Sequence, residues 1–217
     1  MVSVSNRELP FDRLRANGNY LMIEDCTALI LAGGDSRRMG QDKAALVLDG
    51  KTLLQSVTAT MQAAFPRVIV SVRQARAGLD VPQVCDAQVD SGPLAGLAAG
   101  MEGAASPWIF AVACDMPFIT RAVIEYLAGQ RVDCQAVVPV VHGYPQPLAA
   151  FYATSCLDVV QDILKRDGKH SLRVLLEKLQ VRYVSEEQML AVDPQLRSFF
   201  DLDTPQDVAI AMNEVKK

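Results

Sequence analysis

The chain has 217 residues, of which half are apolar and 21% are charged, and its formal charge at pH 7 is -4. This length and composition predict a soluble globular protein with one domain and a substantial core. The net negative charge argues against a nucleic-acid binder, and no apolar run approaches the ~18 residues that a membrane helix needs. Five scattered cysteines and two histidines argue against a disulfide framework or a histidine-based site, so we expect a cytoplasmic protein.

Residues 1–24 show no sustained hydrophobic periodicity. We expect them to form a poorly structured N-terminal tail, followed by a single domain over residues 25–217. A chain that begins at Met22 is therefore expected to keep its fold and activity.

The ordered part begins with CTALILA, an apolar run of strand length that starts at Cys26. In chain order, the pattern then predicts a helix at 52–64, a strand at 67–72, a helix at 94–105, a strand at 108–114 and a helix at 120–129. Strands at 135–141 and 148–152, helices at 155–165 and 171–179, a short strand from 181 and a helix at 205–215 complete the series. This alternation predicts an α/β fold, a three-layer Rossmann-like arrangement whose mostly parallel sheet has helices on both faces.

Polar segments follow the predicted strands. They are LAGGDSRRMGQDK after the first strand, DAQVDSGP after a short segment at Val84, CDMP after WIFAVA, and DLDTP after a strand expected at 198–200. Ligands of open α/β sheets bind outside the carboxyl ends of the strands, so these four segments are expected to meet at one site.

The first segment suits a triphosphate. Gly33 and Gly34 let the backbone approach a ligand closely, and Arg37, Arg38 and Lys43 add three cations. The spacing is not that of a Walker A loop, and GxGxxG occurs nowhere in the chain. The competing interpretation is a plain strand-to-helix turn with a solvated basic face.

Asp115 is the candidate ligand for Mg²⁺, because a carboxylate at the end of an apolar strand offers the oxygen that this ion prefers. Capping of the helix near Thr120 is the alternative, but Thr120 is the better-placed cap. Asp201 and Asp203 alternate along the chain and could face one cation, with Asp201 the favoured ligand. Capping by Asp203 or Thr204, ahead of Pro205, is the competing interpretation.

These residues resemble those of the molybdenum cofactor guanylyltransferases, from about Thr27 to Asp207. The resemblance rests on LAGGDSRRMGQDK, SGPLAGL, CDMPF, PQPLAAFY and DTPQD. It implies a GT-A-like nucleotidyltransferase fold and transfer of GMP from GTP to molybdopterin, with Mg²⁺ as cofactor. It also implies molybdenum cofactor biosynthesis proteins as partners.

Carried over by position, the resemblance assigns Leu31, Ala32 and Gly33 to the guanine nucleotide and Lys43 to its phosphates. Asp86 would lie by the nucleoside, and Asp115 would bind Mg²⁺. The residues expected to bind the nucleotide also include Gly34, Arg37, Ser71, Gly92, Pro93 and Leu94. The residues expected to be catalytic are Lys43, Arg38 and Asp115.

The acceptor is expected near the start of the helix at 171–179. Lys169, His170 and Arg173 follow Asp167-Gly168 there, and Lys169 and Arg173 could hold the phosphate of molybdopterin. A solvated basic face is the alternative.

Two positions depart from the guanylyltransferase pattern. Ser71 stands where an Asn is frequent, and Asp201 and Asp203 stand where Asn residues are common. The related cytidylyltransferases more often carry DxDTP, but LAGG and Gly-Pro-Leu favour guanine. A cytidylyltransferase, a sugar-phosphate nucleotidyltransferase and a nucleotide-binding module without turnover therefore stay open as alternatives at this point.

Overall fold

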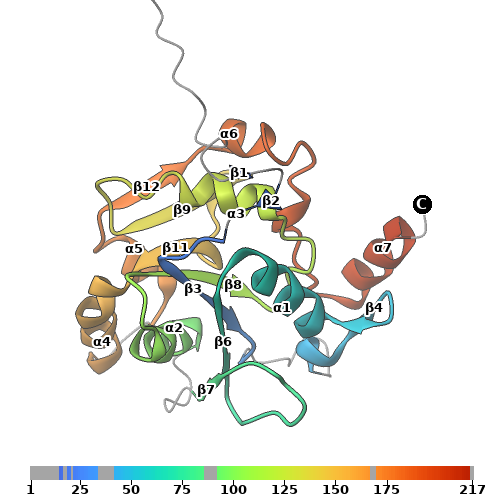
Figure 1. The fold of residues 1–217 in the computed structure, drawn as a ribbon, viewed down its shortest axis with the longest axis horizontal. Coiled ribbons are helices and arrows are strands. Elements are labelled where there is room, and N and C mark those ends of the chain that lie inside the picture. The colour runs from blue at the N-terminus through green and yellow to red at the C-terminus, as the bar shows by residue number, and fades with distance from the viewer. Residues whose placement is uncertain are drawn as a thin grey trace, which may run out of the picture.

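The computed structural model describes residues 15–16, 19–20, 22–33, 42–85, 92–166 and 170–215, with only the backbone described at 15–16, 19–20, 205 and 213–215. An eight-stranded sheet lies in the middle of three layers (Figure 1). Its strands follow the order β10-β9-β11-β8-β3-β6-β7, and β12 pairs with β9. The expected three-layer α/β fold, with a mostly parallel sheet, is confirmed.

One half of the sheet is parallel. β3 (Cys26–Leu31) lies between β8 (Trp108–Ala113) and β6 (Arg67–Val72), and β7 (Gln83–Cys85) pairs with β6 at its outer edge. Because all four strands run the same way, their carboxyl ends lie along one edge of the sheet.

The other half is mixed. β11 (Ala149–Ala153) runs antiparallel between β8 and β9 (Ala136–Val141), and β10 (Tyr144–Pro145) forms a hairpin with β9. His142 and Gly143 both have positive φ in the hairpin turn, as expected of a tight two-residue connection. β12 (Val181–Val184) pairs parallel with β9.

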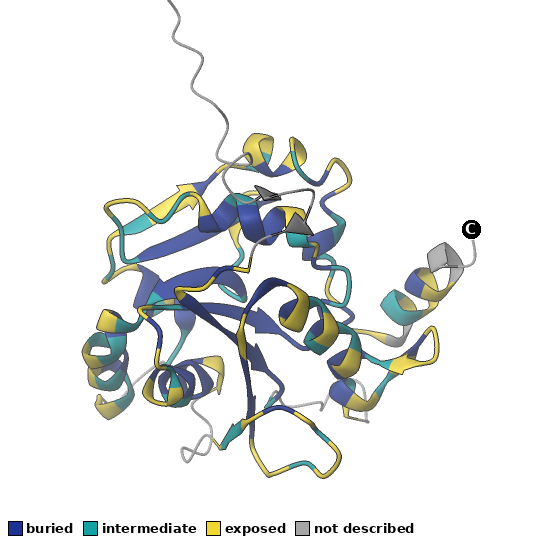
Figure 2. Cartoon of the chain, viewed as in Figure 1, coloured by how far each residue is buried: buried dark blue, intermediate teal, exposed yellow. Residues whose placement is uncertain are grey.

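Helices cover both faces. On one face the core includes residues of α1 (Leu53–Ala64), α3 (Arg121–Ala128) and α6 (Glu186–Leu190). On the other it includes residues of α2 (Gly92–Gly103), α4 (Leu157–Lys165) and α5 (Leu172–Leu176). The β3 side chains alternate between the two cores, which explains why this strand is apolar throughout and buried in Figure 2.

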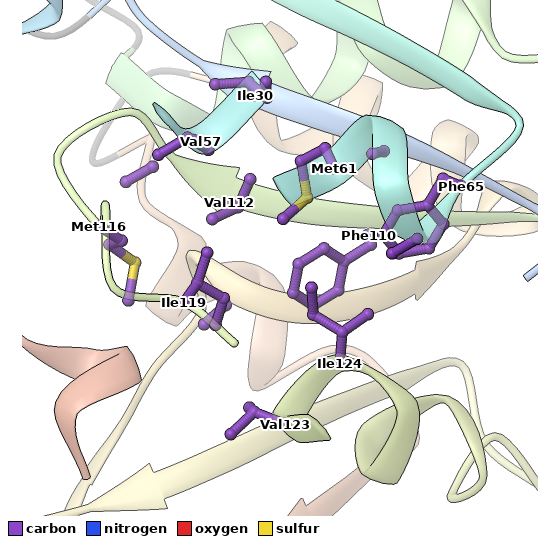
Figure 3. Close-up of a cluster of buried hydrophobic side chains, with 14 of the residues drawn as sticks. Ile30, Val57, Met61, Phe65, Phe110, Val112, Met116, Ile119, Val123 and Ile124 are labelled. Carbon is purple, nitrogen blue, oxygen red and sulfur yellow. The ribbon is translucent and has the colours of Figure 1, made fainter. Parts of the chain in front are cut away.

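The first of these cores is built around aromatic side chains. Phe65 stacks on Phe110, with 5.6 Å between ring centroids, and Met61 and Ile124 approach the same cluster from α1 and α3 (Figure 3). Outside the two main cores, α7 (Pro205–Val215) lies beside the hairpin of β4 (Val47–Leu48) and β5 (Lys51–Thr52) in Figure 1. Short 3-10 turns occupy Lys43–Ala45 (η3), Thr154–Cys156 (η4) and Arg197–Phe199 (η5).

Helix starts follow their capping residues. Thr52 caps α1 in a capping box with Gln55, and the Thr120 hydroxyl accepts the Val123 amide at the start of α3. Thr120 is thus the cap of α3, as expected, and Asp115 is not.

The strand expected at 198–200 is wrong, because η5 covers Arg197–Phe199 instead. Three apolar or small residues are too few to distinguish a strand from a helical turn. The sequence interpretation also lacked α6 and the β4–β5 hairpin.

Part of the expected N-terminal tail has structure. Residues 15–16 (β1) pair with 19–20 (β2), and Ile23 is buried, with its amide donating to the Ala64 carbonyl at 3.0 Å. Among the helices that the structure describes, none combines the length and apolar character needed to cross a bilayer.

Candidate active site

Three of the four polar segments predicted to converge, those that follow Leu31, Ala113 and Phe200, are joined by backbone hydrogen bonds at the carboxyl edge of the sheet. The Ala32 amide donates to the Ser71 carbonyl at 2.9 Å, and the Cys114 amide donates to the Leu31 carbonyl at 3.1 Å. The Leu202 amide donates to the Asp115 carbonyl at 3.0 Å. This last bond brings the DLDTP segment to the end of β8, even though no strand precedes it.

A cavity of about 620 Å³ opens at this edge, a size typical of small-molecule sites. Nine of the residues predicted from the sequence line it: Leu31, Ala32, Gly33, Lys43, Ser71, Gly92, Pro93, Asp115 and Asp201. Leu94 does not, because it is fully buried in the core between α2 and the sheet.

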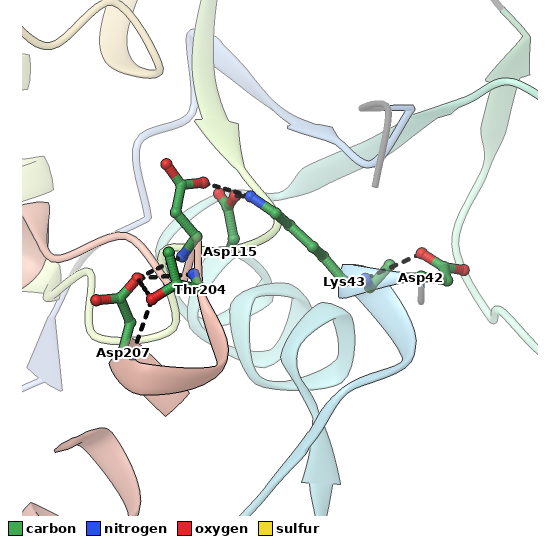
Figure 4. A network of polar contacts seen from close by, with 7 residues as sticks. Asp42, Lys43, Asp115, Thr204 and Asp207 are labelled. Atoms are coloured by element: carbon green, nitrogen blue, oxygen red, sulfur yellow. Dashed lines mark hydrogen bonds and ion pairs between the residues drawn. The ribbon is translucent and has the colours of Figure 1, made fainter. Parts of the chain in front are cut away.

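Lys43 lies at the centre of the charged part of the cavity. Its Nζ donates to Asp115 Oδ2 at 2.9 Å and also to Asp203 Oδ1 (Figure 4 shows Lys43 extended toward Asp115). Burial favours the neutral amine, but the hydrogen bonds to the two carboxylates outweigh it and raise the pKa of Lys43. Lys43 is therefore a cation shared by two aspartates from distant parts of the chain.

Lys43 is positioned by its own turn. It begins η3, and Asp42 caps this turn by accepting the Ala44 amide at 3.1 Å. The side chain of Lys43 is only 20% exposed, so it is directed into the cavity and not along the surface.

Asp201 has the most perturbed carboxylate of the site. Its pKa rises to about 7, first because protein surrounds it and then because Asp115 and Asp203 are negatively charged. Asp201 lines the cavity and is exposed to solvent. Any additional cation that enters the cavity would stabilise the charged form of this carboxylate.

Capping of α7 does not involve the Asp203 side chain. Asp207 Oδ2 accepts the amides of Asp203 and Thr204 at 3.1 and 2.7 Å, and the Thr204 hydroxyl accepts the Asp207 amide at 3.2 Å (Figure 4). Thr204 and Asp207 thus close a reciprocal cap. This leaves the Asp203 carboxylate available to Lys43.

The opposite side of the cavity is built by close packing. A Cβ added to Gly96 of α2 would lie 2.5 Å from Leu31 Cδ2 and 2.8 Å from Ser71 Oγ. Glycine therefore allows α2 to approach β3 and β6 closely enough to bring Gly92 and Pro93 to the cavity. Ser71 is buried, and within the described residues its hydroxyl has no hydrogen-bond partner.

Five predicted residues lie outside the described part of the chain: Gly34, Arg37, Arg38, Asp86 and Lys169. Arg173 is described, and it does not join the cavity. Its side chain is 91% exposed on α5, and its Nε lies 3.5 Å from Glu177. His170 contacts the Arg166 carbonyl at 2.7 Å.

The sequence interpretation missed several cavity residues. Among them are Arg73, Gly96, Gln146, Pro147 and Leu148. The last three belong to the PQPLAAFY segment, where a Pro-rich turn ahead of an apolar strand was a usable signal. The Tyr152 hydroxyl fixes this turn by donating to the Pro147 carbonyl at 2.8 Å.

The residues present fit Mg²⁺. Within the described ranges no three His, Cys, Asp or Glu side chains form a ready-made metal cage. Mg²⁺ does not need one, since one or two carboxylates usually bind it together with waters and substrate phosphates. Asp115 and Asp203 already converge on one cation, and their oxygen atoms are of the type that Mg²⁺ prefers.

Fold and site together place the chain among the α/β nucleotidyltransferases, whose nucleotide lies at the carboxyl edge of the sheet. A family model described as the MobA-like NTP transferase domain matches residues 28–183, and the chain belongs to this family.

Two relatives and one solved structure show the similarity in detail. The molybdenum cofactor guanylyltransferase of Desulfosudis oleivorans is 34% identical, with 88% of this chain and 96% of that protein covered. The protein of the same name from Syntrophotalea carbinolica is also 34% identical, with 83% and 88% covered. Molybdopterin-guanine dinucleotide biosynthesis protein A of Archaeoglobus fulgidus is 29% identical in sequence. Its structure superposes with a TM-score of 0.77, covering 88% of this chain and 98% of that one.

Proposed function

We propose that this protein is a Mg²⁺-dependent guanylyltransferase that transfers GMP from GTP to molybdopterin and releases pyrophosphate. The observation that carries the proposal is Lys43, held between Asp115 and Asp203 above a cavity at the carboxyl edge of the sheet. The names of the relatives supply the two substrates.

The reaction needs no general base. The terminal phosphate of molybdopterin is a monoester whose second pKa is about 6, so it is mostly dianionic at neutral pH. One of its oxygens forms a bond to the α-phosphorus of GTP, and the bond from that phosphorus to the β-phosphate oxygen breaks. Pyrophosphate leaves with the electron pair. Catalysis then depends on aligning two anions and neutralising the charge of the leaving group.

Each part of the cavity has a task in this proposal. Leu31, Ala32, Gly33 and Ser71 contact the nucleoside part of GTP, together with Gly92 and Pro93. Lys43 contacts its phosphates. Gly34, Arg37, Arg38 and Asp86 belong to the same nucleotide set, although they lie outside the described residues. Lys169 and Arg173 stay a prediction for the acceptor phosphate.

Asp115 and Asp201 are the proposed ligands of Mg²⁺, with Asp203 within reach of the same cation. Bound there, the ion would neutralise charge on the triphosphate and on pyrophosphate. Since the Lys43 ammonium already hydrogen-bonds Asp115 and Asp203, it competes for the oxygens that the ion needs. Lys43 therefore turns from these carboxylates toward the phosphates when the nucleotide binds.

The test is a transfer assay that follows pyrophosphate release from GTP, CTP and ATP in the presence of molybdopterin and Mg²⁺. We expect GTP to be the preferred donor. Preference for CTP would establish the cytidylyltransferase alternative, and nucleotide binding without pyrophosphate release would indicate a module that does not catalyse transfer.

The Asp115→Asn variant tests the metal assignment. Turnover should fall by about two or more orders of magnitude, because an amide binds Mg²⁺ less tightly than a carboxylate and the transition state is then stabilised less. The melting temperature should stay nearly unchanged. Asp162→Asn, on the exposed face of α4, is the matched control and should keep full activity. If Asp115→Asn keeps most of its activity at saturating Mg²⁺, the assignment is wrong.

A further inference from the structure

An ion pair behind the cavity connects the β6–β7 connection to the turn that carries Lys43. Arg76 Nη1 donates to Asp42 Oδ2 at 2.5 Å. Its Nη2 makes a longer contact of 3.5 Å with the Ala32 carbonyl. Ala32 and Asp42 flank residues 33–41, the stretch in which the glycines and arginines of the first motif lie. One guanidinium therefore contacts the chain on both sides of that stretch.

Arg76 is itself anchored to the sheet. Its amide donates to Gln83 Oε1 at 2.8 Å, and Gln83 Nε2 donates to the Arg76 carbonyl at 2.8 Å. Gln83 is the first residue of β7 and pairs with Val70 of β6. Two hydrogen bonds from a residue of the sheet thus hold the backbone from which the guanidinium extends.

The contact continues from Asp42 to the catalytic lysine. One carboxylate oxygen of Asp42 accepts the hydrogen bond from Arg76 Nη1, and the other accepts the Ala44 amide at 3.1 Å. The second bond caps η3, which begins at Lys43. The bond to Arg76 keeps the pKa of Asp42 below its ordinary value, so the carboxylate stays charged. Asp42 lines the cavity, whereas Arg76 is not among the residues that form its wall.

We propose that Arg76 is a positioning residue that acts through Asp42 to hold Lys43 where it can contact the phosphates of the nucleotide. Its guanidinium contacts both Asp42 and the Ala32 carbonyl. Because Asp42 caps η3, the position of Asp42 determines the position of Lys43, the first residue of this turn. A planar, forked group suits this task because it can contact two acceptors at once, which a lysine ammonium on a flexible stem does less well. The inference rests on the proposed function, since it takes Lys43 to be the phosphate contact.

Equilibrium binding of GTP with Mg²⁺ tests the proposal. Arg76→Gln and Asp42→Asn should each weaken GTP binding about five- to tenfold, and the double variant should be no weaker than either alone, because both remove one contact. Arg76→Lys should recover part of the loss. Arg67→Gln is the matched control, at the exposed amino end of β6 and far from the carboxyl edge, and should bind as the wild type does.

A Lys43→Met background separates positioning from direct contact. There, Arg76→Gln should cause no further loss of GTP affinity. Losses that multiply in this background, or a wild-type affinity in Arg76→Gln, would overturn the inference while leaving the proposed function intact. A large fall in melting temperature for Arg76→Gln with normal affinity of the folded fraction would reduce Arg76 to a structural residue. Failure of the wild type to bind GTP would overturn both proposals.

Discussion

The two walls of the cavity are built on different principles. The neutral wall consists of backbone and small or uncharged residues: Leu31, Ala32, Gly33, Ser71, Gly92, Pro93 and Gly96. The charged wall is the cluster of Lys43, Asp115, Asp201 and Asp203, and the charged residues Asp42 and Arg73 also line the cavity. Steric fit between α2 and the sheet determines the first, and mutual attraction and repulsion of charges determine the second. Substitutions that add volume to the neutral wall should therefore lower stability, and substitutions that change a charge in the charged wall should alter turnover or metal binding.

The largest effect is expected from Lys43→Met in the charged wall. Turnover should fall by about 10²- to 10³-fold, the usual loss when a donor to developing charge is removed. In the absence of nucleotide, the same change should strengthen Mg²⁺ binding measured by calorimetry, because the ammonium no longer competes for Asp115 and Asp203.

Lys51→Met, on the exposed strand β5, is the matched control for Lys43→Met and should change neither quantity. If Lys43→Met lowers both turnover and Mg²⁺ affinity, lysine and metal do not share the carboxylates.

The glycines that let α2 pack closely should give the next largest effect. A Cβ at Gly100 would lie 2.3 Å from Leu29 Cδ2 and 2.9 Å from its Cγ, and Leu29 is fully buried. Overpacking of this kind costs about 1–3 kcal/mol, more than the ~0.5–1 kcal/mol that alanine gains over glycine in a helix. Gly100→Ala should therefore lower the free energy of unfolding, measured in urea, without changing nucleotide affinity.

Two further substitutions on α2 refine this test. Gly96→Ala should lower both stability and nucleotide affinity, because its Cβ would displace Leu31 and Ser71 of the neutral wall. Gly103→Ala is the control, since its Cβ would be 3.3 Å from the nearest atom, in the Val84 side chain. Equal losses at all three positions would mean that the closeness of the Cβ contact does not determine the outcome, and an equal gain at all three would mean that helix propensity does.

Asp201→Asn tests whether ligation or capping explains the DLDTP segment. The Mg²⁺ concentration for half-maximal activity should rise about tenfold, as expected when an amide replaces a carboxylate ligand. Asp207→Ala removes the cap of α7 and should destabilise the protein by about 0.5–2 kcal/mol without changing the Mg²⁺ requirement. An unchanged requirement in Asp201→Asn would exclude it from the metal site.

The Asp201→Asn variant should also change the pH dependence of stability when no metal is bound. The pKa of Asp201 is about 7 in the folded protein, above its ordinary value of 3.8, because of burial and the negative charges of Asp115 and Asp203. The folded state therefore binds the extra proton between these values. The stability of the wild type relative to Asp201→Asn should fall as pH rises from about 4 to 7 and stay constant above. In EDTA, we expect a change of about 2–4 °C in the difference between the melting temperatures.

Much of the fold follows from local patterns. The helix expected at 205–215 is α7 from Pro205 to Val215, because Pro at the first turn and a Thr cap mark its start. The strand at 67–72 is β6, as its apolar run predicts. Where the run was shorter, at 198–200, the pattern could not distinguish a strand from a 3-10 turn.

The site was predictable in its residue types but not in its pairings. Strand-end motifs indicated Lys43 and Asp115 as neighbours, since parallel strands share one carboxyl edge. The sequence favoured Asp201 over Asp203 because capping competes for Asp203. Only the tertiary structure shows Thr204 and Asp207 taking the cap while Asp203 bonds Lys43, 160 residues away in the chain. Gly96 was missed for a similar reason, because its role depends on the distance between α2 and β3.

The smallest effect should come from Ser71→Ala, in the neutral wall. The Ser71 hydroxyl is buried and, within the described residues, has no hydrogen-bond partner, so it has lost its hydration without a compensating bond. Its removal should leave the melting temperature of the nucleotide-free protein unchanged or slightly raised. If the hydroxyl bonds the nucleotide, as we propose, affinity for GTP should fall about three- to tenfold, the usual loss of one hydrogen bond. Thr58→Val is the matched control: it removes another hydroxyl without a partner, on α1 and away from the cavity, and should leave GTP affinity as it is. A fall in melting temperature with unchanged affinity in Ser71→Ala would make Ser71 a packing residue like Gly96, and the neutral wall would then contact the nucleotide through its backbone.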